Sequence, residues 1–116
     1  MSPSTAQQAK ADALRRLHSA DKPLVLANVW DVPTARIVET AGFPAIATSS
    51  AGVAWTLGYP DGQRISRNEM LEIAGGIANA VTLPVTVDLE NGYGFDADAI
   101  TMTVAGLIAA GAVGLN

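Results

Sequence analysis

Residues 66–90 read SRNEMLEIAGGIANAVTLPVTVDLE, a helical pattern that runs directly into a short apolar segment. Through residues 70–81 the apolar positions recur at the spacing of one helix face. Ser66, followed three residues later by Glu69, forms the capping box that marks the start of a helix. The apolar segment at residues 84–90 begins with a proline, which ends the preceding element, and is typical of a strand buried on both faces. The stretch therefore predicts a helix that leads into a buried parallel strand.

The same alternation extends over the rest of the chain. Strands are predicted at residues 23–30, 44–50, 84–90 and 112–116, and helices at residues 5–19, 32–41, 66–81 and 97–110. Parallel strands joined by right-handed helical crossovers are the architecture that this order requires. Both an open doubly wound sheet and a closed eightfold barrel use such an order. We expect an α/β fold in a single domain over residues 1–116, because no linker or change of composition divides the chain.

Composition excludes several classes of function. The sequence has no cysteine, which rules out disulfides, Cys-ligated zinc and thiol nucleophiles. A formal net charge of −4 gives no basic footprint, so neither nucleic acid nor an anionic membrane is an expected partner. The first twenty residues lack the apolar stretch of a signal peptide, which favours a cytoplasmic protein.

One uncharged run, residues 99–115, approaches the length of a membrane span. It contains three glycines and two threonines, a composition that favours a buried helix turning into a buried strand. A transmembrane helix is the less favoured alternative.

The segment DLENGYG, residues 88–94, carries the strongest chemical signal. Residues 68–116 hold six acidic side chains and no Lys or Arg, and two of the six, Asp88 and Glu90, end a predicted strand. Residues at i and i+2 of a strand point to the same side, so both carboxylates can address one hard cation, and Mg²⁺ fits best. The alternative is a solvated acidic strand end that runs into a glycine turn.

A second polar segment, TSSAGVAWTLGYPDG at residues 48–62, begins with the three residues that end the strand predicted at 44–50. The hydroxyl residues Thr48, Ser49 and Ser50 lie at the expected rim of the sheet, where hydroxyl and free backbone N–H groups suit a substrate carboxylate or phosphonate. Asp61 at the other end of the segment is a candidate for proton transfer or for an outer-shell metal contact. Turn capping by the serines, and an ordinary Pro-Asp-Gly turn at Asp61, are the alternatives.

Four motifs in order resemble the isocitrate lyase and phosphoenolpyruvate mutase superfamily. They are NVWDVPTARIVETAGFPAIATSS at residues 28–50, LGYPDG at 57–62, PVTVDLENGYG at 84–94 and GAVGLN at 111–116. The resemblance implies a (β/α)8 TIM-type barrel, a homotetrameric enzyme, and the use of Mg²⁺ to cleave or form C–C or P–C bonds in small carboxylates. It favours the barrel over the open sheet.

The resemblance also implies roles for individual residues. Asp88 and Glu90 match the metal-binding acidic pair, Asp61 matches an aspartate that follows the second strand, and Ser49 with Ser50 match the segment that holds the substrate carboxylate. Ser50 stands where glycine is frequent in the family, and Glu90 where aspartate is frequent. The longer Glu90 side chain favours a water-bridged contact to the metal.

Length limits what this sequence can encode. A complete barrel needs about 250 residues, so 116 residues ending in a fourth strand correspond to the N-terminal half.

We expect a magnesium-dependent lyase that cleaves a C–C bond of a methylisocitrate-like or oxaloacetate-like carboxylate through an enolate. The alternatives are phosphonopyruvate P–C chemistry and a barrel fragment without activity.

Overall fold

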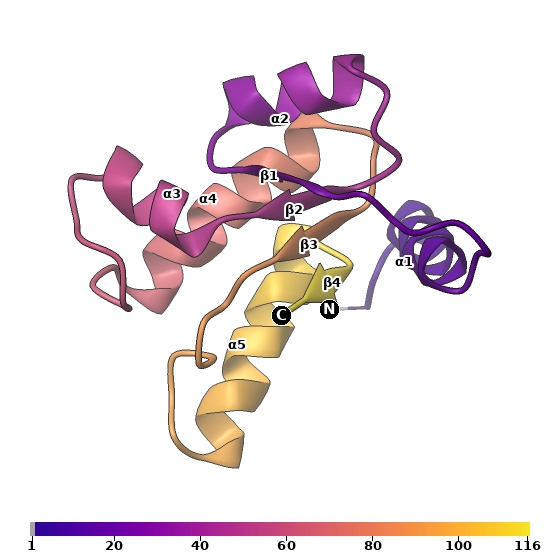
Figure 1. Ribbon diagram of the computed structural model, residues 1–116. Coiled ribbons are helices and arrows are strands. Elements are labelled where there is room, and N and C mark those ends of the chain that lie inside the picture. The colour runs from indigo at the N-terminus through magenta and orange to yellow at the C-terminus, as the bar shows by residue number, and fades with distance from the viewer. Residues whose placement is uncertain (1) are drawn as a thin grey trace.

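The computed structural model describes residues 2–116 as alternating helices and strands (Figure 1). In chain order the elements are α1 (Thr5–His18), β1 (Ala27–Val29), α2 (Val32–Thr40), β2 (Ile46–Thr48), α3 (Ser50–Thr56), α4 (Arg67–Ala80), β3 (Val85–Val87), α5 (Ala97–Ala110) and β4 (Gly114–Leu115). The predicted α/β fold with parallel strands is confirmed.

The four strands form one parallel sheet in the order β1-β2-β3-β4. Each crossover therefore steps to the next strand in the same direction. A doubly wound sheet has a point at which the strand order reverses, and a barrel does not. The sheet thus has the sequential order of one part of a (β/α)8 barrel.

The helices α2, α4 and α5 form a layer on one side of the sheet, with α4 packed between the other two (Figure 1). The core lies between this layer and the strands. Its fully buried side chains include Ile77 and Met70 of α4, Ile46 of β2, and Val85 and Val87 of β3. The capping box of Ser66 and Glu69 fixes the start of α4, as the sequence predicts.

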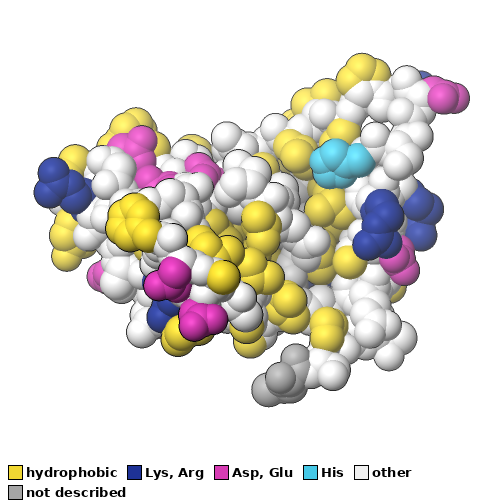
Figure 2. Space-filling view, turned by 90° about the horizontal axis from the view of Figure 1, so that it is seen from below, with side chains coloured by type: hydrophobic (Ala, Val, Ile, Leu, Met, Phe, Trp, Pro, Cys, Tyr) yellow, Lys and Arg dark blue, Asp and Glu magenta, His cyan; other side chains and the backbone are white. Residues whose placement is uncertain are grey.

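Helix α1 lies apart from this layer and covers the amino-terminal ends of β3 and β4. The side-chain amide of Gln7 donates to the carbonyl of Ala112 at 3.0 Å, and the Lys10 ammonium donates to the carbonyl of Val81 at 3.2 Å. Leu14, the buried residue of α1, is only 6% exposed. Figure 2 shows hydrophobic side chains in the hollow between this helix and the rest of the molecule, and basic side chains gathered on its outer side.

Two details differ from the sequence-based expectation. The strands have two or three residues each, shorter than the apolar runs that predict them. Ser50 does not end β2 but begins the short helix α3, which has no clear periodic signal in the sequence.

The run at residues 99–115 forms α5 and β4, and no helix in residues 2–116 has the length and apolar character of a membrane span.

Candidate active site

Asp88 lies directly after β3 and is held by the last residue of the neighbouring strand β2 and the first residue of α3. Its Oδ2 accepts a hydrogen bond of 2.7 Å from the Ser50 hydroxyl, and its backbone N–H donates to Thr48 Oγ1 at 3.0 Å. Both hydroxyl residues are buried, at 4% exposure for Thr48 and 8% for Ser50. Because charge-assisted hydrogen bonds fix a carboxylate firmly, Asp88 has a defined orientation at the carboxyl end of the sheet.

Glu90 reaches the same region by a different route from the one predicted. The strand ends at Val87, and Glu90 has a φ of +54°, so strand alternation does not set its direction. Its backbone N–H donates to Asp88 Oδ1 at 3.0 Å. Its carboxylate accepts hydrogen bonds from the backbone N–H of Gln63 at 3.1 Å and from the Tyr93 hydroxyl at 3.3 Å. The turn, rather than a strand face, brings Glu90 beside Asp88.

Both carboxylates influence the half-buried Tyr93. The pKa of the Tyr93 hydroxyl is raised most by burial, then by the charge of Glu90, by the hydrogen bond to Glu90 and by the charge of Asp88. The hydroxyl therefore stays protonated at neutral pH and remains a donor to Glu90. Tyr93 belongs to the GYG motif, but its contact with Glu90 was not predicted from the sequence.

The glycines after Glu90 allow this tight turn. Gly92 has a φ of +85°, in the left-handed region that favours glycine. A Cβ at Gly94 would overlap the Cβ of Ala99 in α5. The buried hydroxyl of Thr103 donates to the carbonyl of Gly92 at 2.7 Å and so ties the turn to α5.

The other predicted residues have local partners. Ser49 is the N-cap of α3, where its hydroxyl accepts from the backbone N–H of Gly52 at 3.1 Å. Asp61 is exposed, and its carboxylate accepts from the backbone N–H of Gly62 at 2.9 Å, as in an ordinary turn. Within residues 2–116, no hydrogen bond joins Asp61 to Asp88 or Glu90. Thr48 and Ser50 therefore bond Asp88 directly, whereas Ser49 and Asp61 have no hydrogen bond to either carboxylate residue within residues 2–116.

The donor set fits Mg²⁺ in kind and number. No group of three or more His, Asp or Glu side chains in the described chain is arranged to hold a metal. Mg²⁺ nevertheless needs only one or two carboxylates, because it retains several waters. The single ion pair found in residues 2–116 joins Arg15 and Asp12 on α1, so no Lys or Arg neutralises Asp88 or Glu90. Two carboxylates without a cationic partner are a suitable pair for a hard divalent cation.

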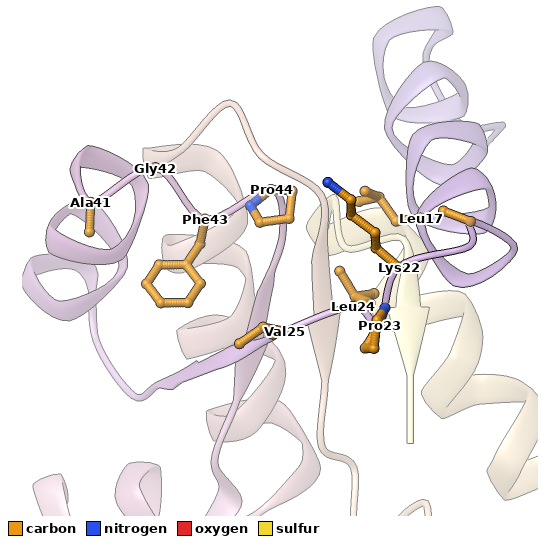
Figure 3. A pocket seen from close by; sticks show the side chains of 10 residues that line it. Leu17, Lys22, Pro23, Leu24, Val25, Ala41, Gly42, Phe43 and Pro44 are labelled. Carbon is orange, nitrogen blue, oxygen red and sulfur yellow. The ribbon is translucent and has the colours of Figure 1, made fainter.

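An open polar depression of about 440 Å³ lies next to Glu90. Its lining residues are Gln63, Ser66, Arg67, Asn68 and Tyr93, and two of these, Gln63 and Tyr93, bond Glu90 directly. A larger hollow of about 480 Å³ lies at the opposite, amino-terminal end of the sheet and is lined mainly by apolar residues (Figure 3). The depression at the carboxyl end is thus lined by polar residues, two of which contact the Glu90 carboxylate, whereas the hollow at the amino-terminal end is mainly apolar.

A sequentially ordered parallel sheet with an acidic pair at its carboxyl edge is typical of α/β-barrel enzymes, whose active sites lie at that edge. Comparison with known proteins identifies the family. The family model for phosphoenolpyruvate phosphomutase matches residues 14–116, and the chain belongs to the phosphoenolpyruvate mutase/isocitrate lyase superfamily.

Individual relatives show how far the similarity extends. An uncharacterized protein of Mycobacterium tuberculosis (strain ATCC 25618 / H37Rv) is 43% identical over 95 residues, which are 82% of this chain and 36% of the relative. Oxaloacetate decarboxylase of Bradyrhizobium sp. (strain ORS 278) is 37% identical over 108 residues, 92% of this chain and 37% of that enzyme. The crystal structure of phosphoenolpyruvate phosphomutase from Streptomyces platensis subsp. rosaceus matches with a TM-score of 0.85 and 33% identity, covering 90% of this chain and 36% of the other. The chain thus spans little more than a third of these relatives.

Proposed function

We propose that the chain carries the metal-binding part of the active site of a magnesium-dependent lyase that cleaves a C–C bond in a small 2-oxo or 2-hydroxy carboxylate. The observation that carries the proposal is the Asp88 carboxylate, held by the Ser50 hydroxyl and the Glu90 N–H with no cationic side chain bonded to it. The similarity to oxaloacetate decarboxylase supports the choice of C–C chemistry.

In this proposal Asp88 and Glu90 hold the metal, and each residue around them has a defined task. When bound, Mg²⁺ supplies positive charge that stabilises the negative charge developing on substrate oxygens. Thr48 and Ser50 keep Asp88 oriented, and together with Ser49 they are the residues proposed to face the substrate carboxylate at the carboxyl edge of the sheet. Asp61, in the loop between α3 and α4, makes polar contacts or transfers a proton.

Calorimetry with Mg²⁺ and oxalate tests the proposed site on the 116-residue chain. Oxalate resembles the two adjacent oxygen-bearing carbons of a 2-oxo carboxylate. We expect Mg²⁺ to bind alone, and oxalate to bind only when Mg²⁺ is present. Binding of oxalate that is unaffected by removal of Mg²⁺ would contradict the proposed site.

A turnover assay tests the reaction. We expect Mg²⁺-dependent release of pyruvate from oxaloacetate by an enzyme that contains this site. Phosphonopyruvate P–C chemistry is the second candidate, favoured by the match to the phosphomutase family model over residues 14–116. Interconversion of phosphonopyruvate and phosphoenolpyruvate without turnover of oxaloacetate would establish that alternative, and Mg²⁺ binding without either reaction would indicate a binding fragment.

A further inference from the structure

A hydrogen-bonded ring joins the loop between α3 and α4 to the turn after β3. The backbone N–H of Gln63 donates to Glu90 Oε1 at 3.1 Å, and the Tyr93 hydroxyl donates to Glu90 Oε2 at 3.3 Å. The ring closes through Asn91, whose Oδ1 accepts from the Tyr93 N–H at 3.0 Å and from the side-chain amide of Gln63.

The backbone of this ring has an uncommon conformation. Gln63, Glu90 and Tyr93 have φ values of +59°, +54° and +61°. In the described part of the chain, they are the only residues other than glycine with positive φ. Side-chain-bearing residues adopt this region at a cost, and such residues cluster at functional sites because the surrounding contacts hold them there. Here all three belong to one set of contacts around a single carboxylate.

We propose that Gln63 is a positioning residue of the acidic site: it orients the Glu90 carboxylate for the cation and anchors the loop that carries Asp61. This inference rests on the proposed function. An ionised carboxylate has about four lone-pair positions, and the two hydrogen bonds from Gln63 and Tyr93 use one on each oxygen. The remaining lone-pair positions are available to a metal or to its waters. Gln63 therefore fixes the direction of the Glu90 carboxylate and still leaves it able to bind a cation.

The test is Mg²⁺ affinity measured by calorimetry on folded protein. Gln63→Ala keeps the backbone N–H that donates to Glu90 but removes the side-chain bond to Asn91 that closes the ring and holds this N–H in place. We expect Mg²⁺ to bind about tenfold more weakly, as when other residues that orient metal ligands are lost. Gln63→Met keeps the side-chain length without a donor and should bind as weakly as the Ala variant. Gln8→Ala, which removes an exposed glutamine side chain from α1, is the matched control and should bind like the wild type. Wild-type affinity in Gln63→Ala, or restored affinity in Gln63→Met, would overturn the positioning role.

Amide hydrogen exchange separates this inference from the proposed function, because it needs no metal. We expect the Gln63 amide to exchange slowly in the wild type and faster in Glu90→Ala, which removes its acceptor. If the wild type binds no Mg²⁺, the proposed metal site fails and the orienting role fails with it, while slow exchange at Gln63 would still establish the link between the loops. Fast exchange at Gln63 in the wild type would refute the ring itself.

Discussion

At the amino-terminal end of the sheet, apolar side chains such as Leu17, Leu24 and Phe43 line a hollow (Figure 3), whereas at the carboxyl end Ser50, Asp88 and their neighbours form hydrogen bonds around carboxylates. The two ends belong to the same strands and share one core. The carboxyl end also contains Gln63, Glu90 and Tyr93, the residues other than glycine that have positive φ in the described part of the chain. In barrel enzymes the amino-terminal end contributes to stability and the carboxyl end to chemistry. In this molecule the apolar hollow and the acidic pair lie at these two ends respectively.

The largest expected effect is on stability and comes from the amino-terminal end. Leu14→Ala removes the buried side chain with which α1 covers the sheet, and should lower the free energy of unfolding by about 2–4 kcal/mol. Urea denaturation measures it. Val25→Ala, at a residue that is 63% exposed at the same end, is the control and should change stability by less than about 0.5 kcal/mol. Weaker Mg²⁺ binding by folded Leu14→Ala would contradict the view that the amino-terminal end affects stability without affecting metal binding.

A smaller effect on stability, but a larger one on metal binding, is expected from Ser50→Ala. The variant loses the hydroxyl that donates to Asp88 at 2.7 Å, so Mg²⁺ affinity should fall about tenfold, with a stability loss of about 1–2 kcal/mol. Ser49→Ala is the matched control: it loses the cap of α3, which should cost about 1 kcal/mol, but it leaves Asp88 untouched. Equal Mg²⁺ affinities of the two variants would contradict the role assigned to Ser50.

The smallest expected effect concerns pH and the amino-terminal end. The Glu39 carboxylate of α2 accepts from the backbone N–H of Thr82 at 2.7 Å and from its hydroxyl at 2.8 Å, and these bonds lower the pKa of Glu39. A lowered folded-state pKa stabilises the protein above the unfolded-state pKa, and this contribution is lost as pH falls through the folded-state value. Glu39→Gln should therefore flatten the decline of stability on the acid side of about pH 4.5.

Urea denaturation of Glu39→Gln at pH 7 and at pH 3.5 measures the change. Glu72→Gln, at an exposed position of α4, is the control for removing one acidic side chain. If the two variants lose stability in parallel with the wild type on acidification, the contact with Thr82 has no role in acid sensitivity.

Most of the fold could be predicted from the sequence because its signals are local. The cap at Ser66, the left-handed glycine after α5 and the buried runs each act within a few residues, and together they define the order of helices and strands. The helix α3 was missed because its seven residues, beginning at Ser50, are too few to show a periodic apolar face.

The candidate site was only partly predictable. Asp88 and Glu90 stand out as carboxylates in a segment without bases, but strand alternation was the wrong reason to bring them together. The contact of Gln63 with Glu90 joins residues 27 positions apart through a backbone N–H. Such a contact depends on tertiary structure and leaves no pattern in the sequence. The proposed roles of all six candidate residues stay predictions: Thr48, Ser49, Ser50, Asp61, Asp88 and Glu90.

Calorimetric titration of Mg²⁺ into the wild-type chain and into Asp88→Ala/Glu90→Ala tests the central claim most directly, with circular dichroism to verify that both are folded. We expect one Mg²⁺ to bind the wild type and no measurable binding to the double variant, since both carboxylates are gone. Equal Mg²⁺ binding by the two folded proteins would contradict the assignment of these carboxylates to a metal site.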